Sequence, residues 1–301
     1  MKDAKPIAVG IDFGTTNTTL VYQDGDSFRA FKVDGHEYIP SVVAYTLQKS
    51  EAANKQAPSY FIGYEAVQAF REEGEIFAFC RHFKMLLGAS VAGKLNEHLV
   101  HPEYREYAAA YDDANRTPVD VAADFLMALI DFFCSDTKIA GVAVTKEQIA
   151  LTVTVPNQWL THLMNKDSVG QGNPIEGMRE ALRRAGFNEA DGEKMGFKRL
   201  QFIAEPEAAT AFFAHEYHKS FHKEQPQGYC GRVLVVDWGG GTLDLTLSRV
   251  SPGQQSNAEG ASSYRANIDP YVFAAGDRTA ACDRTAACCH TARPSRDVLH
   301  R

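Results

Sequence analysis

The sequence predicts an α/β fold in which a mixed sheet is flanked by helices. Three observations support this prediction. The 301 residues are 45% hydrophobic and 23% charged, which is ordinary for a globular chain with a packed core. Short strand-like segments, two of them joined by a hairpin signal, come first along the chain. Helical and strand periodicities then alternate up to about residue 250, which is typical of α/β architecture.

The composition excludes several classes of protein. The net charge of −7 argues against a dedicated nucleic-acid binder, which usually has a concentrated basic surface. The sequence has no apolar run long enough to span a bilayer and no secretory signal at its start. We therefore predict a cytoplasmic protein without nucleic-acid or membrane partners.

The first elements expected are four short strands. Asp24-Gly25, between the second and third, is a strong signal for a two-residue hairpin turn. The expected strands cover residues 7–9, 18–22, 27–32 and 41–45.

Three amphipathic helices are expected next. The first follows an apolar stripe over residues 76–87 and is ended by Gly88. The second begins at Thr117-Pro118, where a capping residue precedes proline at the first helical position. The third covers residues 173–186, and a β-branched strand at 149–155 comes before it.

The last patterned segments complete the alternation of strand and helix. They are a strand at 200–204, a helix at 205–219, and strands at 233–236 and 243–250. Residues 251–301 contain too few large aliphatic and aromatic side chains for a core, and they repeat the hexapeptide Asp-Arg-Thr-Ala-Ala-Cys. We interpret them as a low-complexity tail that is disordered or out of frame.

A glycine-containing turn between the first two strands is the first candidate for chemistry. It spans Gly10–Thr18 and includes Gly14, Thr15, Thr16 and Asn17. Such a turn can present backbone N–H groups to phosphate, and Asp12 at the strand end can hold Mg²⁺ through its waters. A plain Gly-Thr hairpin is the alternative interpretation.

A second turn repeats this design at Val236–Asp244. An apolar strand leads to Asp237, and a glycine-rich turn with a threonine precedes the next strand. Two such turns facing each other could clamp a polyphosphate, with one carboxylate from each on the metal. Three glycines also suit an ordinary tight turn, but that does not explain the repeated aspartate and threonine. The residues of this second turn are Gly239, Gly240, Gly241 and Thr242.

Two further residues stand at candidate positions. Glu205 precedes Pro206 at a strand-to-helix junction, where it could orient a water or simply complement the helix dipole. Lys84 is expected beside the apolar stripe of its helix, a position from which lysine usually reaches solvent.

Taken in order, these motifs resemble the ATPase domain of the heat shock protein 70 chaperones, in the actin and sugar-kinase superfamily. The two glycine turns, Ile39–Tyr45 and Phe61-Ile62-Gly63 are similar to family markers in the family's order. The strand Val153–Pro156 and the segment Glu205–Ala209 follow the same order. The resemblance covers residues 7–250 and implies an actin-like, ribonuclease-H-like lobe I.

The resemblance also implies roles for individual residues toward ATP or ADP and Mg²⁺. Asp12 and Asp237 would hold the metal through its waters. Lys84 would lie beside the γ-phosphate and the attacking water, which Glu205 would orient. The cofactor-binding residues implied are Gly14, Thr15, Thr16, Asn17, Gly239, Gly240, Gly241 and Thr242.

The chain departs from the family after the second turn, where later markers are missing. We expect lobe I at residues 1–225, the start of an incomplete lobe II at 226–250, and the tail at 251–301. An incomplete lobe would leave an apolar sheet edge and face uncovered. We therefore expect weak ATP affinity and poor solubility.

These observations leave three functional interpretations open. The leading one is an ATP-binding ATPase domain of a chaperone, whose family relatives act with co-chaperones and unfolded clients. The second is an inactive pseudo-chaperone that serves as an interaction module. The third is a frameshifted product without a function.

Overall fold

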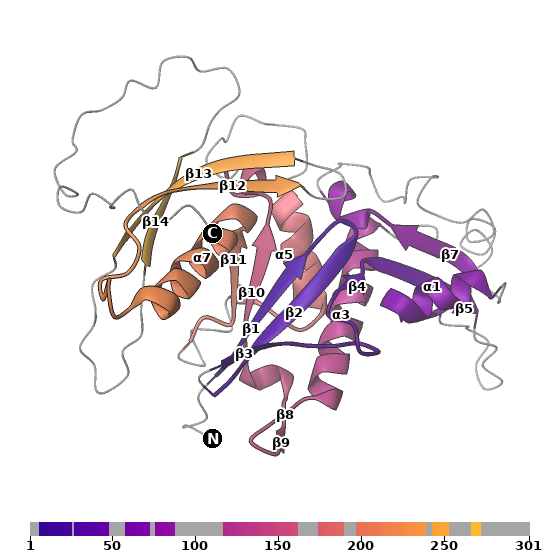
Figure 1. The fold of residues 1–301 in the computed structure, drawn as a ribbon. Helices are drawn as coiled ribbons and strands as arrows, with labels where there is room; N and C mark the ends of the chain where they lie inside the picture. Colours follow the sequence, from indigo (N-terminus) through magenta and orange to yellow (C-terminus); the bar gives the residue numbers. More distant parts are fainter. Residues whose placement is uncertain are drawn as a thin grey trace, which may run out of the picture. The chain divides into compact units, whose positions relative to one another are not determined.

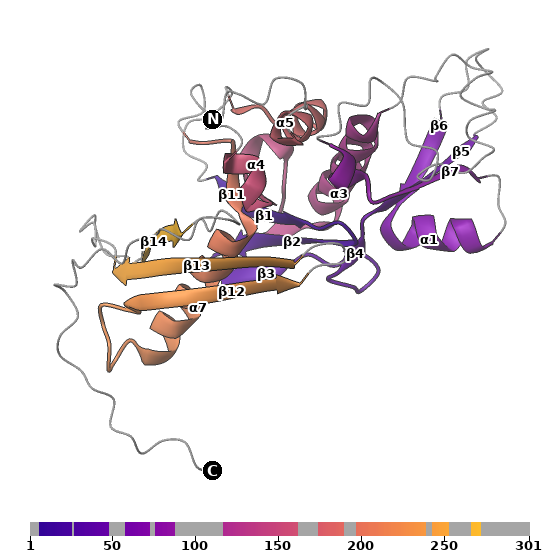
Figure 2. The same cartoon turned by 90° about the horizontal axis from the view of Figure 1, so that it is seen from above.

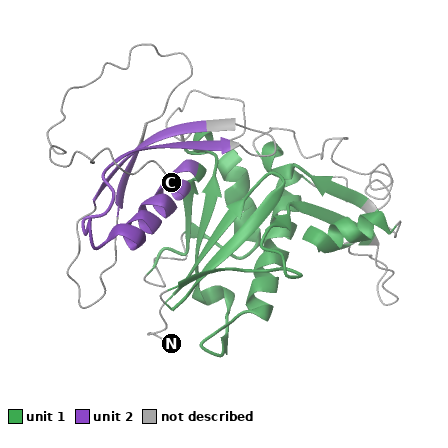
Figure 3. Ribbon diagram, in the orientation of Figure 1, with its two compact units in different colours: residues 1–205, 238–242 green, residues 206–237, 243–301 purple. Residues whose placement is uncertain are grey.

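The computed structural model describes residues 6–25, 27–47, 58–72, 76–87, 117–161, 174–189, 197–238, 243–252 and 266–271. Figure 3 divides the chain into two compact units. Unit 1 comprises Met1–Glu205 and Trp238–Thr242, and unit 2 comprises Pro206–Asp237 and Leu243–Arg301. The division after Glu205 differs from the expected lobe boundary at 225, and each unit is described by itself.

The main sheet of unit 1 has six strands and is mixed, as predicted (Figure 1). Its order is β11-β10-β1-β2-β3, and β4 pairs with β2. β1 and β11 each pair in parallel with β10, whereas β1–β2 and β2–β3 are antiparallel. The strands are β1 (Ile7–Phe13), β2 (Asn17–Asp24), β3 (Ser27–Ala30), β4 (Ile39–Pro40), β10 (Ile149–Val155) and β11 (Leu200–Ala204).

Two helices, α3 (Pro118–Asp136) and α5 (Pro174–Arg184), cover one face of this sheet (Figure 2). Along β10 the residues alternate between buried and half-buried, so one face of the strand enters the core beneath the helices. That core includes Phe13, Phe125 and Val153, each completely buried. The alternation places Thr152 and Thr154 on the opposite, partly open face.

The N-terminus of α3 is fixed by the cap that the sequence predicts. The Thr117 side chain accepts a hydrogen bond from the Asp120 backbone N–H, and the Asp120 carboxylate accepts one from Thr117 in return. Asp120 also forms an ion pair with Arg184 at the end of α5, which ties the two helices together.

A second, three-stranded sheet in unit 1 has the order β6-β5-β7 and is antiparallel. Its strands are β5 (Val42–Leu47), β6 (Pro58–Ile62) and β7 (Ile76–Arg81), and α1 (Gly63–Arg71) packs against it. The other elements among the described residues of this unit are the hairpin β8 (Lys138–Ile139) and β9 (Val142–Ala143), η1 (Phe83–Leu86), η3 (Lys146–Gln148) and α4 (Asn157–Thr161).

The helix expected over residues 76–87 is wrong. This segment forms strand β7 and then the 3-10 helix η1, separated by His82 in the left-handed region with a φ of 58°. Ile76, Ala78 and Cys80 are buried, a period of two that belongs to a strand. Apolar residues at almost every position fit both periods, and pairing with β5 decides between them.

In its described residues, unit 2 contains one long helix and a three-stranded sheet. The helix α7 begins at Glu205 and ends at Phe221, and the sheet has the order β12-β13-β14. The strands are β12 (Gly231–Trp238), β13 (Leu243–Pro252) and β14 (Ala266–Tyr271).

β14 lies in the segment predicted to lack packed structure, so the expectation is wrong for these six residues. Antiparallel pairing with β13 supplies backbone hydrogen bonds that do not depend on an apolar sequence. The other residues beyond 252 lie outside the described part of the chain.

The exposed positions of β12 and β13 carry large apolar side chains together with Arg232 and Arg249. Leu234, Val236 and Leu245 are 62%, 56% and 59% exposed, far above the values of core side chains. The uncovered apolar side chains expected from the sequence are therefore present. Among the described helices, none has the length and apolar character needed to cross a membrane.

Candidate functional site

The carboxyl ends of the three parallel strands β1, β10 and β11 meet at one edge of the main sheet. Asp12 stands at the end of β1, Thr154 near the end of β10, and Glu205 directly after β11. In open α/β sheets, ligands bind outside the carboxyl ends of the parallel strands. Two of the residues predicted to act on the nucleotide, Asp12 and Glu205, thus lie at the edge where a ligand is expected.

The first glycine turn, Gly14 to Asn17, connects β1 to β2 and is fixed from outside by Ser41. The buried Ser41 hydroxyl donates to the Gly14 carbonyl at 2.8 Å, and its backbone N–H donates to the Thr16 carbonyl at 2.8 Å. A Cβ atom on Gly14 would collide with the Asn17 carbonyl, so the turn requires glycine. Thr16 and Asn17 are exposed and Thr15 is half-buried, which leaves this turn accessible to a ligand.

Ser41 also contacts the strand that follows the turn. Its hydroxyl lies 2.9 Å from the Thr18 hydroxyl, and both residues are buried. The sequence placed Ser41 in a family marker but gave it no role. Because its partners are 23 and 27 residues away, no local pattern could have shown this contact.

Lys84 and Glu205 form a salt bridge. The Lys84 Nζ atom lies 2.5 Å from Glu205 Oε1, and the two side chains are 7% and 17% exposed. These residues are 121 positions apart, and the fold brings them together at the carboxyl end of β11. The fold therefore brings together two residues to which the family resemblance assigns the same attacking water, and those roles stay a prediction.

Lys84 is buried, so the alternative that it reaches solvent does not hold. That alternative assumed a long amphipathic helix, but Lys84 lies in η1, just after the left-handed His82. The 3-10 turn directs the lysine inward, where its ammonium contacts the Glu205 carboxylate and the ring of Trp159. The Lys84 ammonium is 5.9 Å from the Trp159 ring centroid, within cation–π range. A buried ammonium needs such partners because desolvation of an unpaired charge is costly.

Asp12 is exposed and hydrogen-bonded to its neighbouring strand. Thr154 Oγ1 donates to Asp12 Oδ1 at 2.6 Å. No sequence motif assigned Thr154 a role, although its position directly before Val155-Pro156 placed it near the strand end.

The second glycine turn lies outside the described residues, apart from the strand that leads to it. Asp237 is the next-to-last residue of β12 and belongs to unit 2, and Gly239, Gly240, Gly241 and Thr242 lie outside the described residues. Their part in the site stays a prediction.

The donor set at the sheet edge fits Mg²⁺ and a polyphosphate. Mg²⁺ usually keeps several waters and takes one or two carboxylates, so an exposed Asp12 suits it. Within the described ranges there is no cluster of three or more His, Cys, Asp and Glu side chains of the kind that encloses an ion. A metal held through its waters beside phosphates does not need one.

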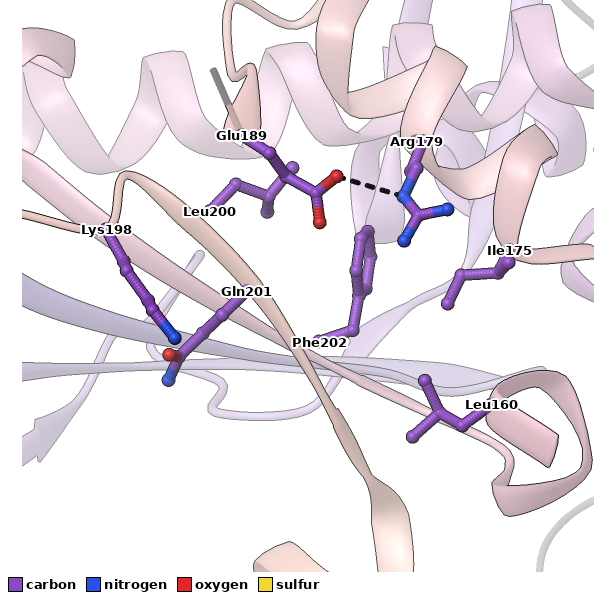
Figure 4. A pocket seen from close by; sticks show the side chains of 8 residues that line it. All are labelled: Leu160, Ile175, Arg179, Glu189, Lys198, Leu200, Gln201 and Phe202. Carbon is purple, nitrogen blue, oxygen red and sulfur yellow. Dashed lines mark hydrogen bonds and ion pairs between the residues drawn. The ribbon is translucent and has the colours of Figure 1, made fainter. Parts of the chain in front are cut away.

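A separate cavity of about 340 Å³ lies beside β11 (Figure 4). Arg179 and Glu189 form an ion pair of 3.1 Å at its wall, and the Arg179 guanidinium lies 5.6 Å from the Phe202 ring centroid. None of the residues predicted to bind nucleotide lines it. The lining residues are Leu160, Ile175, Arg179, Glu189, Lys198, Leu200, Gln201 and Phe202.

Together, the described elements form a mixed α/β fold with Asp12 and Glu205 at the carboxyl edge of its parallel strands. Comparison with known proteins finds chaperones. Chaperone protein HscA of Edwardsiella ictaluri (strain 93-146) is 26% identical over 255 residues, which cover 82% of this chain and 33% of the relative. The HscA homolog of Vibrio parahaemolyticus is 26% identical over 258 residues, with the same coverage. No family model matches the chain.

The chain is a distant homologue of the HscA chaperones, and the resemblance to the heat shock protein 70 family is confirmed. It spans about a third of the length of the curated relatives that it matches.

Proposed function

We propose that the chain is an ATP-binding domain of the heat shock protein 70 type, with an actin-like lobe I and an incomplete lobe II. The observation that supports this most strongly is the buried Lys84–Glu205 pair at the carboxyl edge of the parallel strands, where Asp12 also lies. The first glycine turn, fixed by Ser41, is placed to give backbone N–H groups to the phosphates.

Hydrolysis would follow from positioning and charge. The Glu205 carboxylate accepts a hydrogen bond from the attacking water and orients it toward the γ-phosphorus. The Lys84 ammonium holds Glu205 in place and stabilises negative charge that develops on the phosphoryl oxygens. Asp12 and, in this proposal, Asp237 hold Mg²⁺ through its waters, and the ion supplies charge neutralisation on the phosphates when bound. No covalent enzyme intermediate is required.

The test is single-turnover hydrolysis of ATP in the presence of Mg²⁺. Glu205→Ala should slow the chemical step by about 10²-fold or more, because removal of a positioning carboxylate typically has this effect. Glu207→Ala, two residues along α7, is the matched control and should keep the wild-type rate. Equal rates for wild type and Glu205→Ala would refute the proposed hydrolytic role.

A second candidate function is favoured by the exposed apolar face of β12 and β13. Leu234, Val236 and Leu245 form a surface of the kind that marks protein contacts. The relatives are named chaperones, so co-chaperones and unfolded clients are the partners we propose for this chain. An interaction module without turnover would bind such partners equally well in Glu205→Ala and wild type.

A further inference from the structure

The Asp12 carboxylate is held by a hydroxyl from the adjacent parallel strand. Thr154 Oγ1 donates to Asp12 Oδ1 at 2.6 Å, the length typical of a hydroxyl donating to an ionised carboxylate. The parallel register pairs Ile11 with Val153, so Asp12 and Thr154 are the next residues on both strands. Both side chains therefore project from the sheet face that α3 and α5 do not cover.

This bond orders a side chain that would otherwise rotate in water. Asp12 is exposed, and in the described part of the chain Thr154 is the side-chain partner that the structure gives to it. With one acceptor site of Oδ1 engaged, Oδ2 stays open and would accept a hydrogen bond from a metal-bound water. A carboxylate already fixed in one orientation loses less conformational freedom when the ion arrives.

We propose that Thr154 is a positioning residue for Mg²⁺, acting through Asp12. The inference rests on the proposed function, and it adds a residue to which the sequence analysis assigned no role. Thr154 contacts neither metal nor phosphate in this proposal. It sets the orientation of the carboxylate that does.

The same strand offers a matched control. Thr152 lies two residues earlier on the same face, and its hydroxyl accepts a hydrogen bond from Gln201 Nε2 at 2.9 Å instead of donating to a carboxylate. Valine replaces threonine at either position with nearly the same shape and the same β-branching, so both variants should fold.

The experiment measures nucleotide binding as a function of Mg²⁺ concentration. Titration calorimetry with ATP is performed in EDTA and at increasing Mg²⁺ for wild type, Thr154→Val, Thr154→Ser and Thr152→Val. Thr154→Val should need about tenfold more Mg²⁺ for half-maximal enhancement of ATP binding, the lower end of the range for losing an outer partner of a metal ligand. ATP affinity in EDTA and the melting temperature should match wild type. Thr154→Ser, which keeps the hydroxyl, and Thr152→Val should behave as wild type.

Three results would overturn the inference. Thr154→Val and Thr152→Val with the same Mg²⁺ dependence would show that the hydroxyl does not act on the metal site. An equal loss of ATP affinity with and without Mg²⁺ would assign Thr154 a purely structural role. If the wild-type chain bound ATP equally well with and without Mg²⁺, there would be no metal site for Thr154 to position. In contrast, a wild-type chain that binds no ATP at all would contradict the proposed function itself. The positioning role of Thr154, which rests on that function, would then be refuted as well.

Discussion

Ser41 is a single buried hydroxyl on which the shape of the first glycine turn depends. It contacts the Gly14 carbonyl and the Thr18 hydroxyl, and its replacement by alanine leaves both groups short of a partner. We expect Ser41→Ala to lower the free energy of unfolding by about 1–3 kcal/mol, the cost of an unsatisfied buried polar group. Urea denaturation measures this difference.

The matched control is Ser59→Ala, which removes a hydroxyl that bonds Thr46 at 2.7 Å in a half-buried position. Ser59→Ala should lower the free energy of unfolding clearly less than Ser41→Ala, because water can reach the Thr46 hydroxyl that loses its partner. A Ser41→Ala variant no less stable than Ser59→Ala would show that the turn does not depend on this hydroxyl.

The Lys84–Glu205 ion pair leads to a second prediction at the residue scale, about the free energy of unfolding. Lys84→Met fills the same space but removes the ammonium partner of the largely buried Glu205 carboxylate. We expect a loss of about 3 kcal/mol in the free energy of unfolding, the lower end for breaking a buried pair, because Glu205 keeps slight access to water. Chemical denaturation at neutral pH checks the value.

Lys32→Met breaks the pair with Glu37, whose side chains are 55% and 47% exposed. This exposed pair should change stability by less than about 1 kcal/mol. Similar losses in the two variants would mean that burial does not strengthen the Lys84 contact.

For single residues, the sequence predicted where the Asp12 and Glu205 carboxylates lie better than it predicted which side chains contact them. Asp12 and Glu205 stand at strand ends, a position that local pattern identifies. Lys84 was assigned a role only through the family resemblance, since its partner is 121 residues away. Thr154 and Ser41 act across strands, and contacts of this kind follow from sheet register, which the sequence alone did not provide.

The packing of α5 against its surroundings depends on Gly177. A Cβ atom there would lie 2.6 Å from the Leu87 backbone carbonyl and 3.3 Å from Val119 Cγ2. Alanine usually stabilises a helix relative to glycine by about 1 kcal/mol. At this position we expect the opposite sign, a loss of about 1–3 kcal/mol, because backbone cannot move aside easily.

Thermal or urea unfolding of Gly177→Ala measures this change. Gly10→Ala in β1 is the control, since a Cβ there meets no described atom within 4 Å and should cost little. If Gly177→Ala were the more stable variant, α5 would not pack as closely as the structure shows.

The connection between α3 and α5 predicts a pH dependence. Burial by itself raises the pKa of Asp120, but hydrogen bonds from Thr117 and the nearby Arg184 charge outweigh burial and lower the pKa below its ordinary value of 3.8. A lowered folded-state pKa stabilises the fold above the unfolded value, and this contribution is lost as the pH falls below it. Wild type should therefore lose stability between about pH 5 and pH 3.

Asp120→Asn should show a shallower decrease over the same range, measured by urea unfolding at several pH values. Parallel curves for Asp120→Asn and wild type would contradict the role of this carboxylate.

Most elements agree with their sequence patterns, and the failure at residues 76–87 has a physical reason. The capped helix at Thr117-Pro118 and the alternating strand Ile149–Val155 carry signals that only one structure satisfies. The run Ile76–Cys80 is apolar at every position and fits both helix and strand. Pairing with β5, a tertiary contact, made it a strand.

For the whole molecule, the exposed face of β12 and β13 predicts self-association. Leu234 and Val236 lie on the open face, and contiguous exposed apolar surface favours contact between copies. The double variant Leu234→Lys, Val236→Lys should reduce the high-mass fraction measured by light scattering at least about twofold.

Val142→Lys replaces an isolated valine that is 64% exposed on the β8–β9 hairpin, with the same change in charge per site. It should leave the high-mass fraction unchanged. A monodisperse wild-type chain would contradict the prediction.

Residues 251–301 show where composition is an insufficient guide. Their scarcity of large apolar residues predicted no packed structure, yet β14 pairs with β13 through its backbone. The incomplete lobe, in contrast, was predicted from missing family markers and stays a prediction.

The most direct measurement is a double-mutant cycle on the binding of Mg²⁺-ATP, followed by titration calorimetry. If Asp12 and Asp237 hold one ion, Asp12→Asn and Asp237→Asn should each weaken binding about tenfold or more, and the combined variant should lose clearly less than the sum of the two effects. Additive losses, or a wild-type chain with no saturable binding, would show that the two aspartates do not share a magnesium-bound nucleotide.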